Sequence, residues 1–369
     1  MEAKVTREKL LEPLFLAQSV VERKTSMPIL SQVCLKITGK KLELSATDLE
    51  VGLTTGTEII SGRDGQGLVN AKYLYEIVKE APVGCEIVIT QKEKGRVEVK
   101  AGASQYKLGT MEVAEFPEIP KIKSSDAVQI DGSVLDQMID RVSYAISTDE
   151  SRHNLMGVYL ESRGQNTVRM VATDGHRLSI VDREVQGKFS ANAGVIVPKK
   201  GIGGLKRMLA DAASKKVDFC VEGQNAMVRT PSGDLVMRLV DGTFPSYEQV
   251  VPKKFTRTLT VPREGIMGAL KRSMIFSVEK AGGVRLEMDK SSVKVSASST
   301  ELGESSEPVE AVLEGKPLSV GFNARYILDV LAVLADEKIV LQLGDEVSPC
   351  VLRSEFDRGF TAVVMPMKL

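Results

Sequence analysis

The chain has 369 residues, more than one hydrophobic core usually serves, so we expect two or three domains. Its 49 lysines and arginines balance 49 aspartates and glutamates, which excludes a global positive field that would attract a polyanion. Tryptophan is absent and aromatic residues make up 5% of the chain, a composition that disfavours an aromatic stacking platform for single-stranded nucleic acid.

Residues 1–10 contain no apolar signal core, and no apolar run is long enough to span a membrane, so we expect a soluble, cytoplasmic protein. The four cysteines are far apart and form neither a CxxC motif nor a Cys/His pair. We expect isolated, buried thiols, each inside a strand, and we expect no metal or other cofactor. These cysteines are Cys34, Cys85, Cys220 and Cys350.

Three segments carry apolar residues at helical spacing: residues 10–21, residues 135–146 and, more loosely, residues 266–274. Each predicted helix is followed by a strand pair that ends in small or hydroxyl residues. The second strands read LELSATD at residues 42–48, VRMVATD at 168–174 and VKVSASST at 293–300. The recurrence predicts an internal repeat in three copies.

The later half of each copy also matches. GLVNAKYL at residues 67–74 aligns with the NARYI part of LSVGFNARYI at 318–327, and VIVPKK at 195–200 holds the same place in the middle copy. A short helix follows in each case, predicted in the last copy over residues 325–335.

These parallels predict an α+β fold with three similar domains, at residues 1–123, 124–253 and 254–369. Each domain contains two helix-plus-strands halves and has a normal domain size. Repeats that present the same face side by side build an extended or closed surface rather than one catalytic cleft.

The stretch VRMVATDGHRL at residues 168–178 is open to two interpretations. Asp174 and His176, with Ser179 nearby, are residue types found in hydrolase sites, or the stretch is one wall of a binding groove. The sequence contains no GxSxG elbow, no HExxH motif, no Walker loop and no dinucleotide fingerprint. Because no nucleophile is marked by its context, we favour the binding interpretation and expect no catalytic residues.

Four segments occur in an order that resembles one known family across the whole chain. They are ATDGHRL at residues 172–178, LVDGTFPSY at 239–247, GFNARYILDVL at 321–331 and VVMPMKL at 363–369. These segments resemble the bacterial DNA polymerase III β subunit, the sliding-clamp family.

The resemblance implies a head-to-tail homodimer, in which six similar clamp domains close a ring with helices lining the hole. It implies a non-enzymatic processivity factor that encircles double-stranded DNA without reading its sequence. The implied partners are the DNA polymerase III catalytic subunit, the clamp loader, and other polymerases and repair proteins that carry short peptide motifs. The implied location is the cytoplasm, at the nucleoid, with no membrane partner. The alternative is a repeat-built protein scaffold that never encircles DNA.

A sliding ring needs long basic side chains that reach phosphates rather than base edges. By the resemblance, the implied DNA-binding residues are Lys24, Lys72, Arg152, Lys199 and Lys200. For any one of them, a solvated helix face is an equal interpretation.

The resemblance also implies a groove for partner peptides. Gly175 permits a positive φ that lets the backbone approach a peptide, whereas His176 is equally a ligand contact or a structural residue. Gln249, His153 and Asn154 depart from residues common in the family, which puts the detailed partner preference in doubt. The implied groove residues are Leu155, Thr173, Gly175, His176, Arg177, Leu178, Pro245, Val250, Val347, Val363, Met365, Pro366, Met367 and Leu369.

The joint between subunits is implied to combine apolar contacts with lysines that face glutamates. Apolar contacts should dominate, because surface ion pairs contribute little individually. Ala103 and Gln105 stand where relatives often place arginines, so we expect a thinner ionic joint. The implied interface residues are Lys100, Tyr106, Lys107, Leu108, Ile275, Phe276, Glu301 and Glu304, with Glu307 nearby.

Overall fold

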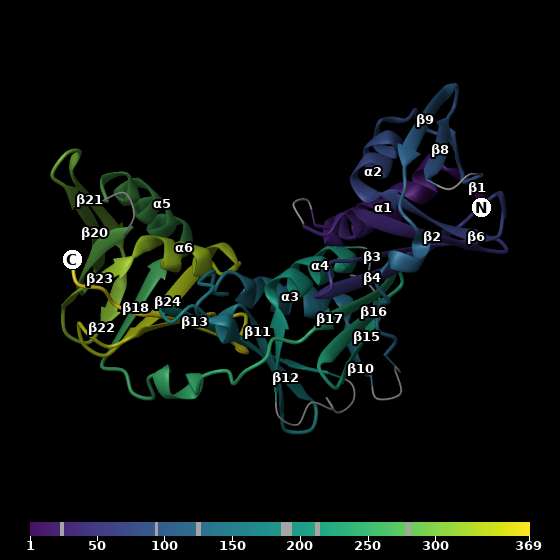
Figure 1. Ribbon diagram of the computed structural model, residues 1–369. Coiled ribbons are helices and arrows are strands. Elements are labelled where there is room, and N and C mark those ends of the chain that lie inside the picture. Colours follow the sequence, from purple (N-terminus) through teal and green to yellow (C-terminus); the bar gives the residue numbers. More distant parts are fainter. Residues whose placement is uncertain (23–25, 93–94, 123–126, 186–193, 211–214, 278–281) are drawn as a thin grey trace. The chain divides into compact units, whose positions relative to one another are not determined.

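The computed structural model describes residues 1–22, 26–92, 95–122, 127–185, 194–210, 215–277 and 282–369 (Figure 1). The chain divides into two compact units. The first is formed mainly by residues 1–136 and 197–239, and the second mainly by residues 137–184 and 240–369.

The first unit holds a five-stranded and an eight-stranded antiparallel sheet. The five-stranded sheet has the order β5-β1-β7-β8-β9, and the eight-stranded sheet has the order β10-β15-β16-β17-β4-β3-β2-β6. The elements are β1 (Glu2–Thr6), α1 (Arg7–Val20), η1 (Pro28–Ser31), β2 (Gln32–Thr38), β3 (Lys41–Thr47), β4 (Val51–Glu58), β5 (Ser61–Arg63), β6 (Gly65–Asn70), α2 (Ala71–Glu80), β7 (Glu86–Thr90), β8 (Arg96–Ala101), β9 (Ser104–Gly109), η2 (Val113–Glu115), β10 (Val128–Asp131), α4 (Lys199–Leu209), β15 (Lys216–Glu222), β16 (Asn225–Thr230) and β17 (Gly233–Arg238).

The second unit holds a nine-stranded sheet, β14-β11-β12-β13-β26-β25-β24-β18-β22, and a four-stranded sheet, β21-β20-β19-β23. Helices α5 and α6 pack side by side in this unit, with α5 against β20 and β21 and α6 against β23 and β26 (Figure 1). The elements are η4 (His153–Leu155), β11 (Gly157–Arg163), β12 (Thr167–Thr173), β13 (Arg177–Glu184), η5 (Tyr247–Val250), β18 (Arg257–Pro262), α5 (Arg263–Ser273), η6 (Met274–Phe276), β19 (Gly283–Asp289), β20 (Ser292–Ser299), β21 (Gly303–Glu310), β22 (Val312–Glu314), β23 (Leu318–Asn323), α6 (Ala324–Ala332), β24 (Lys338–Leu343), β25 (Cys350–Arg353) and β26 (Phe360–Val364), while α3 (Gly132–Ser143) and β14 (Val195–Pro198) cross the boundary between the units.

Two compact units arise from three sequence repeats because the sheets continue across the repeats. In the first unit, β17 of the middle copy pairs with β4 of the first copy, with Leu235 opposite Leu53. In the second unit, β13 of the middle copy pairs with β26 of the third copy, with Leu178 opposite Val363. The middle copy therefore contributes strands to both units.

The repeated helices occur where their apolar spacing predicts them. Leu10 and Leu14 of α1, and Ile266 and Leu270 of α5, are buried. The predicted ends differ: α3 ends at residue 143, before the last apolar residue of the pattern, and α6 ends at Ala332 rather than at residue 335. Helix ends depend on local capping, which apolar spacing does not encode.

The recurring Asn-Ala pair has a local physical cause. The Asn70 side chain accepts a hydrogen bond from the backbone N–H of Tyr73 at 3.1 Å, and Asn323 accepts one from Arg325 at 3.0 Å. Each asparagine is thus the N-cap of the helix that follows a strand, satisfying an N–H group that has no partner within the helix. In the middle copy Pro198 stands at this place without a side-chain cap.

The shared ATD segment forms the same turn twice. Asp48 Oδ1 accepts hydrogen bonds from the N–H groups of the residues two and three positions later, and Asp174 Oδ1 does likewise. The third position of each turn has positive φ, 79° at Leu49 and 88° at Gly175. These are Asx turns, in which the carboxylate replaces a backbone acceptor.

The expectation for the cysteines is partly wrong. Cys220 and Cys350 are buried in strands, but Cys34 and Cys85 are half-buried, and Cys85 precedes β7 rather than lying inside a strand. All four thiols are free. Burial raises the pKa of the Cys34 thiol to about 11, which disfavours its reactive thiolate form. Across the residues that the structure describes, no helix has the length and apolar character needed to cross a membrane.

Candidate binding surfaces

The turn between β12 and β13 is built by the side chains of Thr173 and Asp174. The Thr173 hydroxyl donates to the carbonyl of Arg177 at 2.6 Å and accepts the N–H of Gly175 at 3.1 Å. Asp174 Oδ1 accepts the N–H groups of His176 and Arg177 at 2.9 and 3.0 Å. Both side chains are therefore engaged in shaping the turn, and Asp174 is a scaffold residue rather than the orienting acid of a catalytic histidine.

Arg177 is held from several sides, and its side chain is only 12% exposed. Its Nε lies 3.0 Å from Asp174 Oδ2, and its other N–H groups donate to the carboxylate of Asp329 and the backbone carbonyl of Tyr144. The guanidinium carbon lies 4.6 Å from the centre of the Tyr326 ring and 5.5 Å from that of Tyr144. Two carboxylates and two aromatic faces engage this charge, so Arg177 fixes the turn against helix α6.

The two residues between these anchors are exposed. The His176 ring stacks on Tyr326 with 6.3 Å between ring centres and 15° between planes. Gly175 has a φ of 88°, and a Cβ at this position would lie 2.7 Å from Nη1 of Arg152. Glycine is therefore needed for both its backbone conformation and its lack of a side chain.

The C-terminal segment joins this turn directly. The N–H of Met365 donates to the carbonyl of His176 at 2.9 Å, which extends the pairing of β26 with β13. Further along, the N–H of Met367 donates to the carbonyl of Gly321 at 2.9 Å. A Cβ at Gly321 or Gly283 would lie within 2.7 Å of the Leu369 side chain, so the last residue packs on strands β19 and β23.

The predicted groove residues fall into two groups. Leu155, Leu178 and Val363 are buried in an apolar cluster that also contains Phe244 and Tyr247. The others are exposed or half-buried, and Val347 stands in the loop after β24, where its N–H donates to Asp345 Oδ1. The accessible apolar members are Val250, Val347, Met365 and Leu369. We call the turn Thr173–Leu178 with Pro245, Val250 and residues 363–369 the partner surface.

The predicted DNA-binding residues differ in how far their charges are already engaged. Lys72 on α2 and Lys199 on α4 are exposed and have no acidic partner among the described residues. Arg152 pairs with Asp149 at 2.8 Å and lies beside Gly175 of the partner surface. Lys24 lies outside the described residues.

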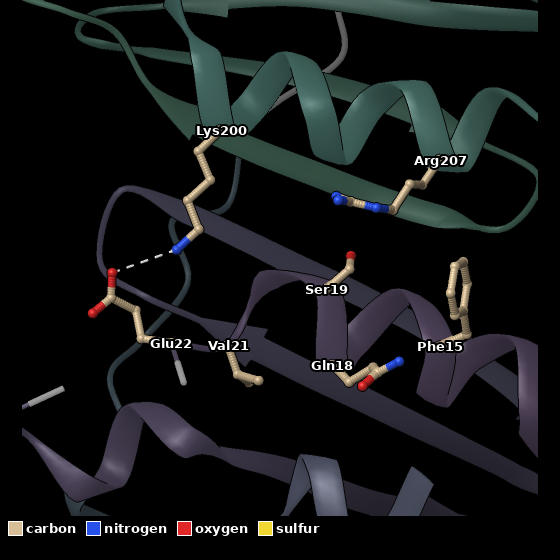
Figure 2. A pocket seen from close by; sticks show the side chains of 7 residues that line it. All are labelled: Phe15, Gln18, Ser19, Val21, Glu22, Lys200 and Arg207. Carbon is tan, nitrogen blue, oxygen red and sulfur yellow. Dashed lines mark ion pairs between the residues drawn. The ribbon is translucent and has the colours of Figure 1, made fainter. Parts of the chain in front are cut away.

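Lys200 is engaged most strongly of this set. It lines a pocket of about 550 Å³ between α1 and α4, together with Phe15, Gln18 and Arg207 (Figure 2). Its Nζ pairs with Glu22 at 3.6 Å and makes a close ion pair with Asp48, whose side chain is only 2% exposed. Arg207 is exposed, with its guanidinium donating to the carbonyl of Gly203. In this pocket Arg207 offers the more accessible charge.

The predicted interface residues lie on or near two edge strands, β9 in the first unit and β21 in the second, with Lys100 on β8 and Ile275 and Phe276 in η6. β9 ends the five-stranded sheet, and its Tyr106 and Lys107 are exposed, with Leu108 half-buried. Lys107 lies 4.0 Å from Glu98 of the same sheet, and Lys100 on β8 is exposed.

In the second unit, β21 ends the four-stranded sheet. Glu301 and Glu304 are exposed, Ile275 is 64% exposed and Phe276 is half-buried. Glu307, in contrast, accepts a bidentate hydrogen bond from Arg272 at 2.8 and 3.0 Å. One of the three glutamates predicted to face lysines across the joint is therefore already paired within its own chain.

Three residues that hold the partner surface carry no signal of that role in the sequence patterns. Tyr144, Tyr326 and Asp329 all contact Arg177, yet only Tyr326 stood in a segment that the repeat comparison aligned. Burial raises the pKa of the Tyr144 hydroxyl, which stays protonated and donates to Ser179 at 3.1 Å. Contacts between distant segments leave no spacing signal.

No cluster of three or more His, Cys, Asp or Glu side chains is placed to hold a metal ion in the part of the chain that the structure describes. The fold and these surfaces define a repeat-built α+β protein with extended surfaces for binding.

Comparison with known proteins supplies the family. Three family models match in order: DNA polymerase III beta subunit, N-terminal domain at residues 1–120, central domain at 129–246 and C-terminal domain at 248–368. The chain is 36% identical to a beta sliding clamp from Pseudomonas putida and 31% identical to one from Escherichia coli, with 100% of each chain covered. The chain belongs to the DNA polymerase III beta subunit family.

Solved structures agree with this assignment. A crystal structure of the DNA polymerase III subunit beta from Pseudomonas aeruginosa matches with a TM-score of 0.93 at 35% identity, covering 100% of both chains. A sliding clamp from the same organism bound to griselimycin matches with a TM-score of 0.94, also at 35% identity and with 100% of both chains covered. The predicted α+β clamp fold is confirmed.

Proposed function

We propose that this protein is a sliding clamp, which encircles duplex DNA and tethers the replicative polymerase and other DNA-processing proteins to it. The observation that carries this proposal is the full-length, in-order match to all three domains of the beta subunit family. A clamp raises processivity by topology and needs no chemical step, so we propose a non-catalytic role in the cytoplasm, at the nucleoid.

The proposed ring is a head-to-tail homodimer of chains with domains at residues 1–123, 124–253 and 254–369. Two edge strands support it, because β9 and β21 belong to different units and each ends a sheet. Unlike surfaces that join head to tail form a closed ring when the rotation permits. An exposed edge strand is a template for pairing with another chain, and here that partner is a second copy.

The proposed DNA contacts are loose and electrostatic. Lys72, Lys199 and Arg207 offer exposed charges, whereas the pairing of Lys200 with Asp48 supports a structural role for that lysine. Sequence-independent binding through phosphates falls steeply with salt, while a closed ring stays on circular DNA without tight contacts.

The partner surface is the proposed site for short peptide motifs. Its exposed methionine and valine side chains border a rigid turn, and methionine adapts to different apolar partners. The griselimycin complex of the Pseudomonas aeruginosa clamp supports the idea that relatives bind peptide-like ligands.

Loading onto nicked circular DNA tests the proposed function. We expect protein loaded by a clamp loader to remain on the circle in high salt and to leave after the circle is cut once. A scaffold that does not encircle DNA would be lost equally from circular and linear forms, and that result would overturn the proposal.

The proposed joint has its own test. The double variant Ile275→Asp plus Phe276→Asp should sediment as a monomer, because charge would enter the apolar part of the joint. A Phe356→Asp variant, at a residue that is 83% exposed, between β25 and β26 of the same unit and outside the predicted set, is the matched control. A double variant that remains dimeric refutes the interface.

A further inference from the structure

A second pocket, separate from the predicted groove residues, lies in the second unit. Its volume is about 1130 Å³, and it is formed on adjacent strands of the nine-stranded sheet. Across these strands Arg169 stands opposite Asp182, Ile180 opposite Thr361, and Thr361 opposite Arg353. The remaining lining comes from residues 247–255 and from the turn between β25 and β26. We call it the sheet-face pocket.

One of its arginines is fully engaged. Arg169 makes a bidentate ion pair with Asp182 at 2.6 and 2.7 Å, and its Nη1 lies 3.2 Å from the Tyr247 hydroxyl. The carboxylate of Glu248 lies 3.5 Å from the same guanidinium. Asp182 is therefore paired with Arg169, while Glu248 lies between Arg169 and Arg163 and makes its closer ion pair with Arg163.

Arg353 is fixed in place without a negative partner. Its Nε donates to Oε1 of Gln342 at 3.0 Å, and its Nη1 donates to the hydroxyl of Thr361 at 3.1 Å. Both acceptors are neutral, and no carboxylate among the described residues reaches this guanidinium. A guanidinium has five N–H groups, so three remain available for a ligand. The side chain is thus pre-oriented and its charge uncompensated.

Two further cations line the pocket. Arg358 and Lys253 are exposed, and neither has an acidic partner in the described ranges. Together with Arg169 and Arg353 they give four positive charges against the two carboxylates of the pocket, an excess of two. Among the residues that the structure describes, three of the four cations have no ion pair. Cations gathered in this way favour an anionic ligand.

The pocket also carries apolar surface and adjoins the partner surface through one short segment. Ile180, Val251 and Phe255 line it. Pro245 and Val250 of the same segment belong to the partner surface, while Tyr247 and Val251 line the sheet-face pocket. We propose that this pocket binds an acidic segment that flanks the short motif of a partner protein, with carboxylates on Arg353, Arg358 and Lys253. This inference rests on the proposed peptide-binding function.

The mixture of groups selects a peptide over a nucleic acid. Duplex DNA presents a continuous row of phosphates, and the carboxylates of Asp182 and Glu248 interrupt the row of cations that would bind such a backbone. Acidic side chains on a peptide can instead be interleaved with apolar ones that fit Ile180 and Phe255. A planar guanidinium held by neutral neighbours accepts a carboxylate in bidentate fashion.

Two synthetic peptides test the proposal by titration at low salt. Both carry a clamp-binding type of motif, with a glutamine and paired hydrophobic residues, and both are extended on each side by four residues. One extension is glutamate and the other is glutamine, so they differ only in charge. We expect the glutamate peptide to bind wild-type protein about tenfold more tightly, the effect of one charge-assisted contact.

The variant Arg353→Gln should abolish that preference, and Arg358→Gln plus Lys253→Gln should reduce it. Arg353→Lys keeps the positive charge but loses the planar guanidinium that can donate two parallel hydrogen bonds to a carboxylate. An intermediate preference for the glutamate peptide is therefore expected. Lys254→Gln is the matched control, because Lys254 is exposed, next in sequence to Lys253, and outside the pocket lining.

Equal binding of the two peptides to wild type would overturn the proposal. So would a Lys254→Gln effect as large as that of Arg353→Gln, since the effect would then be general attraction. Preference for a phosphorylated extension or for an oligonucleotide over glutamate would assign the pocket to phosphate instead. If the glutamine peptide fails to bind at all, the partner surface is wrong. The glutamate extension alone, titrated in the same way, then decides the sheet-face pocket independently.

Discussion

The two Asx turns of the chain, Thr47–Val51 and Thr173–Arg177, share their hydrogen bonds but serve different ends. In each, threonine bonds to the carbonyl four residues later, and aspartate caps two N–H groups. The first turn ends in a buried valine and its aspartate pairs with Lys200. The second ends in Arg177, which joins the turn to α6 beside the partner surface. A repeated scaffold thus becomes a specific surface through the few residues that vary.

Removing either aspartate should have the largest effect, because both turns depend on the carboxylate. Asp48→Ala and Asp174→Ala should each lower the free energy of unfolding by about 4 kcal/mol, as two N–H groups and a cation lose their partner. Asn at either position keeps the Oδ1 acceptor and should cost less. Denaturant unfolding measures the change, and a loss below about 1 kcal/mol at one site would show that the turns are not equivalent.

The two turns should differ in how much their cations, Arg177 and Lys200, contribute to stability. Arg177→Ala should cost about 3 kcal/mol, because a side chain that is 12% exposed leaves two carboxylates behind. Lys200→Ala should cost less, about 2 kcal/mol, because it leaves one buried carboxylate, that of Asp48, which still accepts two backbone N–H groups. Thermal unfolding of both variants measures the two losses of stability, and a larger loss for Lys200→Ala than for Arg177→Ala would contradict this expectation.

The two residues with positive φ should respond to substitution in opposite directions. Leu49→Gly should stabilise the protein by about 0.5–1 kcal/mol, because glycine adopts the left-handed conformation at this position without the steric cost that leucine bears. Little packing is lost, since Leu49 is 54% exposed. Gly175→Ala should destabilise by about 1–2 kcal/mol through strain and the clash with Arg152.

Gly102→Ala is the matched control, since Gly102 has a φ of 58° and a Cβ there would have open space. It isolates the backbone strain from the contact. If Gly175→Ala and Gly102→Ala lower the free energy of unfolding by the same amount, the contact with Arg152 contributes nothing to the loss.

The smallest effect concerns DNA. Lys199→Gln should reduce the slope of log affinity against log salt by about 0.9, the value for one lost phosphate contact. Lys200→Gln should leave the slope nearly unchanged, because Asp48 and Glu22 already neutralise that lysine. Filter binding over a salt series measures both slopes, and equal decreases would mean that Lys200 exchanges its partners for phosphate.

Sequence patterns found the repeats because each copy must bury the same helix and cap the next one with the same residue. That residues 175–178 and 363–369 share a groove was implied by the family resemblance and not by spacing, and the N–H of Met365 does donate to the carbonyl of His176. The patterns did not reveal that Arg177 and Lys200 are already paired, because Asp329 and Asp48 are remote in sequence. Nor did they find Arg353, whose neutral neighbours come from two other strands.

The continuous sheets carry a consequence for synthesis on the ribosome. β4 leaves the ribosome long before β17, its neighbour in the finished sheet. Until residues 233–238 emerge, the first copy therefore presents an open strand edge that resembles an aggregation site. A fragment ending at residue 123 should need a chaperone or a solubilising fusion. Slow translation just after the first copy would lengthen that exposure.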